Sequence, residues 1–201
     1  MDDFGSAVIL CGGKSSRMGF DKCNIKAHNK YLTEVIAEEL TQIFTNIIFV
    51  SNDLEKFIDT KYMVVEDIIA NAGPIGAIYT ALKNATSKYV FVTACDMPII
   101  NLDYINYMIK IIKTKNVQGV VSYNSKYIEP LYAFYSIDMI TAFETEIKKN
   151  NYKLHDVIRN SKMHYVEESI WRKCCGANDI FTNLNYKSDL TVLKNIFLED
   201  T

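Results

Sequence analysis

Short runs of consecutive apolar residues recur along the first half of the chain, and this alternation constrains the fold more than any other feature. The apolar runs are residues 7–11, 47–50, 62–65 and 89–92. Segments with helical spacing of apolar residues follow them, at residues 31–44, 53–58, 75–85 and 102–112. A strand that is apolar on both faces must be covered by helices on both sides, as in parallel sheets. The pattern therefore predicts an α/β fold with a mostly parallel sheet covered by helices.

The second half of the chain is less regular. Strands are predicted at residues 117–123 and 131–135, and helices at residues 137–149, 154–159 and 188–198. We find no linker, repeat or low-complexity block between the two halves, and 201 residues are enough for one substantial core. We therefore expect a single domain over residues 1–201.

The charge and cysteine content exclude several classes of protein. Lys and Arg number 22 against 24 for Asp and Glu, and this balance lacks the basic field that non-specific nucleic-acid binding requires. No apolar run approaches the roughly 20 residues of a membrane span, and the acidic N-terminus is unlike a signal peptide. The five cysteines are odd in number and form no C-x-x-C pair, which favours a reduced chain. We expect a cytoplasmic protein that binds neither nucleic acid nor membranes.

The segment after the first apolar run, residues 10–22, combines glycines, hydroxyls and cations in the order LCGGKSSRMGFDK. Glycines let backbone N–H groups approach a phosphate, and cations neutralise it. Lys14, Arg17 and Lys22 lie within nine residues, where only Asp21 opposes them. The spacing fits neither a Walker A loop nor G-x-G-x-x-G. The segment is either a phosphate-binding loop or a flexible, solvated loop between a strand and a helix.

Acidic residues follow two other predicted strands. Asp96 comes after the run at residues 89–92, and Asp67 comes after the run at residues 62–65. Ligands bind at the carboxyl ends of parallel strands, and a carboxylate there can hold Mg²⁺ against substrate phosphates. The alternative for Asp96 is a turn or helix-capping role before Pro98. Near Asp67, the glycines at 73 and 76 bring the backbone close either to a ligand or to the sheet.

These segments resemble, in the same order, the motifs of the molybdenum cofactor guanylyltransferases, within the wider sugar-nucleotide-type nucleotidyltransferases. Residues 10–22 resemble the signature L-A-G-G-x-S-x-R-M-G-x-D-K, with Cys11 in place of its alanine. Further along the chain, residues 66–67 and 73–76 resemble the motif E-D…G-P-L-x-G, and residues 94–98 resemble C-D-M-P. Residues 129–133 resemble x-P-L-x-A-L-Y, and residues 183–185 resemble N-x-N. The resemblance covers nearly the whole chain.

The resemblance implies a three-layer α/β/α, Rossmann-like nucleotidyltransferase fold. It implies Mg²⁺-dependent transfer of GMP from GTP to molybdopterin-bound molybdenum, with release of pyrophosphate. Residues 1–115 would form the nucleotide-binding half and residues 116–201 the acceptor-binding half. The expected partners are GTP, the molybdopterin cofactor and proteins that deliver the finished cofactor to molybdoenzymes.

Residue roles are carried over from the matching motifs. Arg17, Lys22 and Asp96 are the expected catalytic residues, with Asp96 as the Mg²⁺ ligand. The expected GTP-binding residues lie at strand ends and in the loop: Leu10, Cys11, Gly12, Gly13, Ser15, Lys22, Asn52, Asp67, Gly76 and Asp96. Asn183 and Asn185 are candidates for acceptor binding, with helix capping as their alternative.

Two departures from the family pattern concern guanine recognition. Val50 stands where some members place an Asn that contacts the nucleotide, and Ala77 replaces a glycine after the Gly-Pro turn. Cytidylyl transfer to the same cofactor is the nearest alternative, although that branch resembles L-A-A-G and Gly12-Gly13 favours GTP. A sugar-1-phosphate nucleotidyltransferase is another, although the chain is short for many of those. A non-catalytic binding adaptor is a third, and intact Arg17, Lys22 and Asp96 argue against it.

Overall fold

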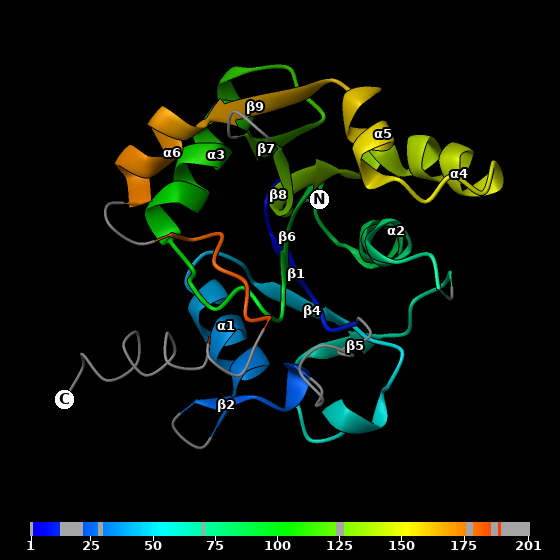
Figure 1. Ribbon diagram of the computed structural model, residues 1–201, viewed down its shortest axis with the longest axis vertical. Coiled ribbons are helices and arrows are strands. Elements are labelled where there is room, and N and C mark those ends of the chain that lie inside the picture. Colours follow the sequence, from blue (N-terminus) through cyan, green and yellow to red (C-terminus); the bar gives the residue numbers. More distant parts are fainter. Residues whose placement is uncertain are drawn as a thin grey trace.

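A central β-sheet organises the computed structural model, which describes residues 2–12, 22–27, 30–69, 71–123, 127–175, 179–185 and 189 (Figure 1). Its strands are β1 (Ser6–Leu10), β4 (Asn46–Val50), β5 (Met63–Val65), β6 (Tyr89–Ala94), β7 (Gly119–Tyr123), β8 (Ile128–Ser136) and β9 (Met163–Glu167). They form a seven-stranded sheet in the order β5-β4-β1-β6-β8-β7-β9. Only β8 runs antiparallel to its neighbours β6 and β7 in this sheet. The predicted mostly parallel sheet is confirmed.

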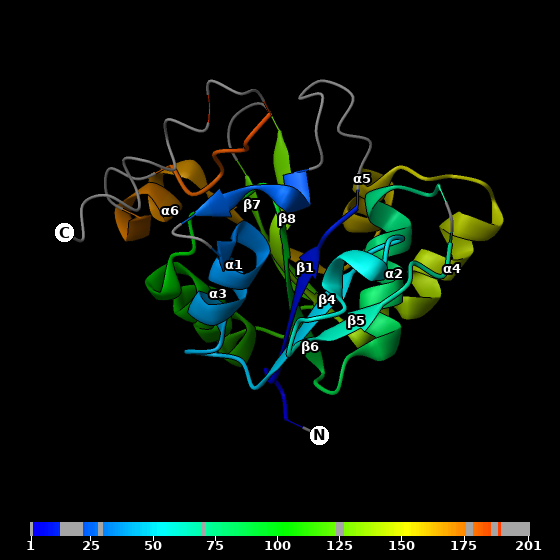
Figure 2. The ribbon, with the colours of Figure 1, turned by 90° about the horizontal axis from the view of Figure 1, so that it is seen from below.

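Helices cover both faces of this sheet (Figure 2). One face carries α1 (Leu32–Leu40), α3 (Leu102–Thr114) and α6 (Glu168–Cys175). The other carries α2 (Pro74–Asn84), α4 (Ile140–Lys148) and α5 (Leu154–Arg159). Successive side chains of a strand point to opposite faces, and in β1 Ala7 and Ile9 join one buried cluster while Val8 and Leu10 join the other. The three-layer α/β/α arrangement is confirmed.

Most elements of the first half lie within a few residues of their predicted positions. The helix α2 begins at Pro74, whose missing N–H suits the first turn of a helix. Gly73 before it has a φ of 67°, a left-handed conformation that favours glycine. The predicted short helix at residues 53–58 is a 3₁₀ turn, η2 (Glu55–Phe57).

The second half differs more from the prediction. The helix expected at residues 137–149 consists of a 3₁₀ turn, η3 (Ile137–Met139), followed by α4. The strand β9 and the helix α6 were not predicted. Cys174 and Cys175 form the end of α6, and Cys175 is buried. The predicted helix at residues 188–198 lies outside the described residues, except for Asp189.

One edge of the sheet gathers the ends of several strands. Leu10 pairs with Val50 and with Ala94, so β1, β4 and β6 end side by side. Because β8 is antiparallel to β6, it is the beginning of β8 that reaches this edge, and the ends of β7 and β9 reach it as well. The loops that follow β1 and β6 therefore share an edge with the ends of the second-half strands.

None of the helices that the structure describes is both long and apolar enough to span a bilayer.

Candidate active site

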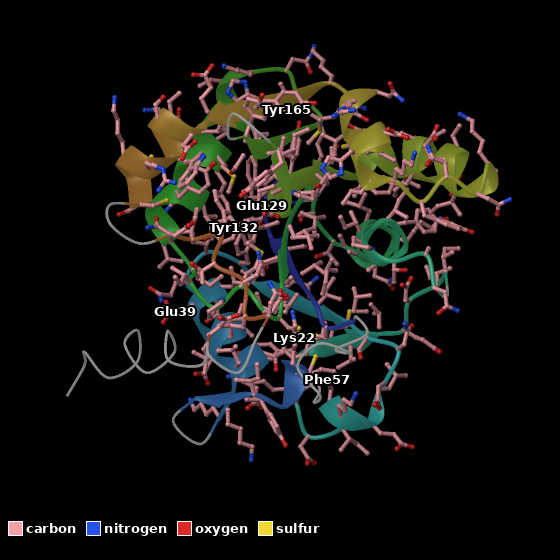
Figure 3. The ribbon with its side chains drawn as sticks, viewed as in Figure 1. Lys22, Glu39, Phe57, Glu129, Tyr132 and Tyr165 are labelled. Atoms are coloured by element: carbon pink, nitrogen blue, oxygen red, sulfur yellow. The ribbon has the colours of Figure 1, made fainter. Side chains whose placement is uncertain are left out.

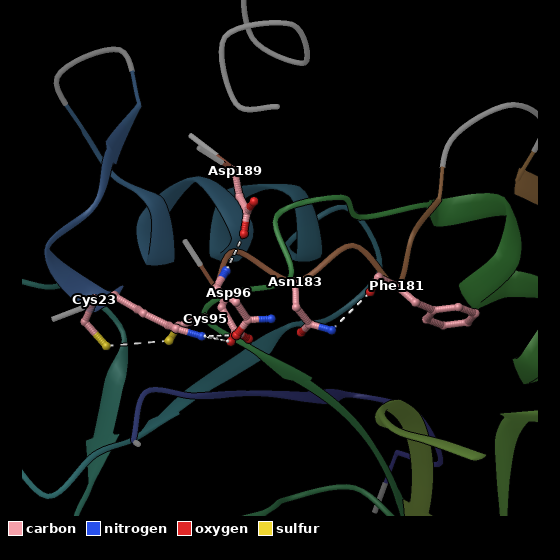
Figure 4. Close-up of polar contacts among 8 residues, drawn as sticks. Cys23, Cys95, Asp96, Phe181, Asn183 and Asp189 are labelled. Carbon is pink, nitrogen blue, oxygen red and sulfur yellow. Dashed lines mark hydrogen bonds and ion pairs between the residues drawn. The ribbon is translucent and has the colours of Figure 1, made fainter. Parts of the chain in front are cut away.

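Lys22, Asp96 and Asn185 meet at this edge of the sheet (Figure 4). The Lys22 Nζ lies 2.6 Å from the Asp96 Oδ2 and donates a second hydrogen bond of 2.9 Å to the Asn185 Oδ1. The Lys22 and Asp96 side chains are each 19% exposed, so the ion pair is only partly screened by solvent. Three residues predicted from three separate motifs thus form one polar cluster.

Backbone contacts fix the Asp96 carboxylate in this place. The Cys95 N–H donates to the Leu10 carbonyl oxygen at 3.1 Å, and the Met97 N–H donates to the Ala94 carbonyl oxygen at 3.1 Å. The first bond continues the pairing of β1 with β6, and the second turns the chain immediately after β6. The Leu184 N–H donates to the Asp96 carbonyl oxygen at 2.9 Å, which attaches the segment 179–185 to the end of β6.

Three buried cysteines lie beneath the polar cluster. The Cys23 thiol, in the 3₁₀ turn η1 (Lys22–Asn24), donates to the Cys11 carbonyl oxygen at 3.3 Å. Its sulfur lies 3.7 Å from the Cys95 Sγ, and this hydrogen bond together with burial raises the pKa of the Cys95 thiol well above its usual value. These cysteines pack as small apolar groups that join η1 to β1 and β6. Cys11, a departure from the family pattern, fits this buried position.

The end of β1 presents its backbone at the site. Leu10 and Cys11 are 5% and 7% exposed, and the Cys11 N–H donates to the Val50 carbonyl oxygen at 2.8 Å. Gly12 is exposed, and a Cβ added to it would meet no atom of the described residues within 4 Å. A ligand therefore has room against the Gly12 backbone. The predicted residues Gly13, Ser15 and Arg17 lie outside the described residues.

Asp67 and Gly76 contact each other at the start of α2. The Asp67 Oδ1 accepts hydrogen bonds from the Ile69 N–H at 3.1 Å and from the Thr80 hydroxyl at 3.0 Å. A Cβ on Gly76 would lie 2.8 Å from the Ala72 Cβ and 3.2 Å from that same Asp67 oxygen. Gly76 thus allows the first turn of α2 to pack against the Asp67 loop.

Asn52 and Asn183 are two further candidate residues. Asn52, two residues beyond the end of β4, is exposed. Asn183 is half-buried, and its side-chain Nδ2 donates to the Phe181 carbonyl oxygen at 3.1 Å (Figure 4). Asn183 and Asn185 flank Leu184, whose backbone bonds Asp96, so both asparagines belong to the segment that closes over the end of β6.

A cavity of about 160 Å³ adjoins the polar cluster on the side of β8. Its lining comes from the facing ends of β7 and β8, from α6 and from the segment 179–183. Glu129, near the start of β8, is labelled in Figure 3. It lines the cavity together with Trp171 and Asn183. Sequence reasoning placed Glu129 inside a motif but gave it no role, and it did not single out Trp171.

Asp96 offers a single carboxylate to a metal ion at this site. Across the described ranges, no group of three or more His, Cys, Asp or Glu side chains is arranged to hold a metal ion. The Asp96 carboxylate nevertheless already holds a cation, the Lys22 ammonium. A single protein carboxylate that shares a cation with substrate phosphates is the usual pattern for Mg²⁺.

Comparison with known proteins decides the family. Residues 7–166 match the sequence model of the MobA-like NTP transferase domain. The chain belongs to the MobA-like NTP transferase family. This MobA-like chain is 42% identical to the molybdenum cofactor guanylyltransferase of Syntrophotalea carbinolica over 92% of its own length and 89% of that protein. It is 35% identical to the probable molybdenum cofactor guanylyltransferase of Peptoclostridium acidaminophilum, over 98% and 91% of the two chains.

Solved structures agree with the fold. The MobA-like chain superposes on the molybdopterin-guanine dinucleotide biosynthesis protein A of Archaeoglobus fulgidus with a TM-score of 0.83. The superposition covers 96% of this chain and 99% of the other, at 22% identity. The expected Rossmann-like nucleotidyltransferase fold is therefore confirmed for this MobA-like chain.

Proposed function

We propose that this chain is a molybdenum cofactor guanylyltransferase. It transfers GMP from GTP to the molybdenum–molybdopterin cofactor, forms the guanine dinucleotide cofactor and releases pyrophosphate. The observation that carries the proposal is the contact of Lys22 with both Asp96 and Asn185, because it unites the three motifs at one point of the fold. Full-length relatives named for this activity support the reaction.

In the reaction, an oxygen of the acceptor's phosphate attacks the α-phosphorus of GTP. The new bond is P–O, and the bond from the α-phosphorus to the pyrophosphate oxygen breaks. Nucleotidyl transfer of this kind depends mainly on positioning and on neutralising charge. Lys22, at the edge where β1 and β6 end, is suited to donate to the α-phosphate once it leaves Asp96. No general base is needed, because a phosphate monoester already carries negative charge.

The proposed Mg²⁺ ligand is the Asp96 carboxylate, completed by the phosphates of GTP. When bound, Mg²⁺ would neutralise charge that develops on the phosphates. The short contact between Asp96 and Lys22 supports this assignment, since it marks a position where a positive charge is stable. Lys22 and Asp96 then separate to act on the same phosphates.

The remaining roles extend the proposal along the edge of the sheet. The backbones of Leu10, Cys11 and Gly12 would line the guanine, and Gly13, Ser15 and Arg17 would hold the triphosphate. Asn52, Asp67 and Gly76 would complete the GTP site. Asn183 and Asn185 would face the acceptor. Residues 1–115 then serve as the nucleotide half and residues 116–201 as the acceptor half.

We also propose the cytoplasm as the site of the reaction and cofactor-delivery proteins as later partners of the product. The reduced cysteines expected from their odd number and spacing support the first proposal. The second follows from the chemistry, because a finished cofactor must pass to the enzymes that use it.

A transfer assay tests the proposal directly. Purified protein is incubated with Mg²⁺, molybdenum–molybdopterin and either GTP or CTP, and both pyrophosphate and the dinucleotide product are measured. We expect product with GTP only. Product with CTP only would establish the cytidylyl alternative, and nucleotide binding without product would establish the adaptor alternative.

A further inference from the structure

The cavity next to Asp96 is rich in hydrogen-bond acceptors. Glu129 and Asp179 both line it, and the negative charge of Asp179 contributes to raising the pKa of the Glu129 carboxyl. The Asn183 side chain also lines it; its Nδ2 donates to the Phe181 carbonyl oxygen, and its Oδ1 can accept a hydrogen bond from a ligand. These acceptors suit a ligand that brings N–H groups.

Glu129 is the half-buried acceptor at the centre of this arrangement. Its Oε1 accepts one hydrogen bond of 3.1 Å, from the Leu131 N–H, and within the described ranges no cation forms an ion pair with it. Burial, with smaller contributions from Asp96 and Asp179, raises the pKa of the Glu129 carboxyl above its usual value. A carboxylate in this position gains from a ligand that donates hydrogen bonds.

Aromatic side chains form the adjoining wall. Trp171 is 2% exposed, and its ring lies edge to face with Phe181, with 4.7 Å between the ring centroids. The Arg172 guanidinium lies over the Trp171 ring at 4.5 Å while its Nε pairs with Glu168 at 2.7 Å. Among the described residues, the buried Trp171 Nε1 has no hydrogen-bond acceptor. The wall thus combines the rings of Trp171 and Phe181 with the Arg172 guanidinium.

The size of the cavity suits an aromatic ring. Its volume is about 160 Å³, and an apolar cavity of roughly 150 Å³ holds benzene in another protein. One ring of a fused bicyclic ligand would fill it, and the second would reach toward the mouth. Asn183 lines the cavity, and the N–H of the next residue, Leu184, donates to the Asp96 carbonyl oxygen, so the cavity lies near Asp96.

We propose that this cavity binds the pterin ring of the acceptor, with the Glu129 carboxylate accepting hydrogen bonds from the 2-amino group and the neighbouring ring N–H. This inference rests on the proposed function. Guanine presents the same amino-and-ring-N–H edge, so the chemistry alone is shared by both substrates. The cavity lies beyond β6 from the loop that follows β1, on the acceptor side of Asp96, and this position favours the pterin.

A binding experiment with a free pterin tests the site without turnover. The full chain is titrated with 6-hydroxymethylpterin, and its affinity is measured by equilibrium dialysis. Trp171 is the only tryptophan of the chain, so quenching of its fluorescence reports binding in this cavity. We expect saturable binding with quenching in the wild type, and about 10- to 100-fold weaker binding in Glu129→Gln, which keeps the shape but loses the charge.

Glu167→Gln is the matched control. Glu167 ends β9 and lines a second, more open hollow, with Arg159 and Tyr165. The same chemical change there should leave pterin binding unchanged. Loss of binding in Glu167→Gln but not in Glu129→Gln would overturn the proposal in favour of the second hollow. Displacement of the pterin by GTP in strict competition, with the same loss of GTP affinity in Glu129→Gln, would assign the cavity to guanine instead.

A kinetic experiment separates failure of this inference from failure of the proposed function. With GTP and molybdenum–molybdopterin, Glu129→Gln should raise the KM for the acceptor at least about 10-fold and leave the KM for GTP unchanged. If the wild type transfers GMP and the acceptor KM of Glu129→Gln is unchanged, the inference is wrong and the proposed function stands. If the wild type binds the pterin at this cavity but transfers no GMP, the proposed function fails and the pterin site stands.

Discussion

The Lys22 ammonium contacts the Asp96 carboxylate at 2.6 Å across 74 positions of sequence. The positive charge of Lys22 and the negative charge of Asp96 therefore neutralise each other within the protein. Under the proposed function, this ion pair would open when Mg²⁺ and the phosphates of GTP bind. This arrangement leads to the first two predictions.

Removing the Asp96 carboxylate should abolish transfer without unfolding the protein. Asp96→Ala should lower pyrophosphate release by at least about 100-fold, as expected for loss of a preorganised charge. Circular dichroism and thermal unfolding should remain close to those of the wild type, because Lys22 keeps its bond to Asn185. Asp103→Asn, an exposed change in the first turn of α3, is the control that should retain activity. Near-normal turnover in Asp96→Ala would remove Asp96 from the metal role.

Removing the Lys22 ammonium should separate metal binding from catalysis. In Lys22→Met, Asp96 loses the cation that contacts it, so we expect tighter binding of Mn²⁺, a spectroscopic substitute for Mg²⁺, in the absence of nucleotide. GMP transfer should fall at the same time, because the α-phosphate loses its lysine. Electron paramagnetic resonance measures free Mn²⁺, and the transfer assay measures turnover. Weaker Mn²⁺ binding than in the wild type would contradict competition at Asp96.

Gly76 and Gly12 should respond differently to the same substitution. Gly76→Ala places a Cβ 2.8 Å from the Ala72 Cβ and 3.0 Å from the Ile69 carbonyl oxygen, so the start of α2 must shift. We expect a loss of about 1–3 kcal/mol in the free energy of unfolding, typical of overpacking. Gly12→Ala meets no atom of the described residues within 4 Å and should leave that free energy unchanged while weakening GTP binding. Denaturant unfolding and GTP titration distinguish the two, and equal destabilisation would refute the packing argument.

Gly119 should tolerate alanine least. It begins β7, and a Cβ there would overlap the Phe134 carbonyl oxygen and the end of the Met163 side chain. Both neighbours belong to strands that pair with β7, and a backbone oxygen cannot rotate away. Gly119→Ala should therefore lower the free energy of unfolding by about 3 kcal/mol or more, or prevent folding. A stability equal to that of Gly12→Ala would show that the sheet shifts freely at this point.

Glu129 should stabilise the fold when it is uncharged. Its pKa is raised in the folded protein, mainly by burial, so the protonated form favours folding. This contribution is fully present below the unfolded pKa of about 4.5 and is lost as pH rises through the folded value. Glu129→Gln should thus be more stable than the wild type at pH 7, and the difference should shrink toward pH 4. Thermal unfolding across this range checks the sign, and a difference that grows toward pH 4 would contradict it.

The regular first half was predictable because each buried strand is a continuous apolar run. β1 and β6 are covered on both faces, so nearly every residue in them carries the signal. The edge strand β9 buries only Val166, and α6 buries only Trp171 and Cys175. Such elements have too few apolar positions to show a period, and they form because β7 and α3 offer them a surface.

The site was predictable in composition but only partly in geometry. Strand ends and motif resemblance brought Lys22 and Asp96 to the same edge. The bond of Lys22 to Asn185 depends on the return of segment 179–185 to the end of β6, which no local pattern encodes. Glu129 lacked a predicted role for the same reason, since its importance comes from the cavity that α6 completes.

The hydrogen bond between Lys22 and Asn185 also constrains when the site can form during synthesis of the chain. The two residues are 163 positions apart, so a chain growing on the ribosome displays its lysine long before the amide that holds it has been synthesised. During that interval β1, β4 and β6 can already pair and Lys22 can contact Asp96, but Asn185 has not yet been made. The polar cluster of Lys22, Asp96 and Asn185 can therefore form only after residue 185 has been synthesised.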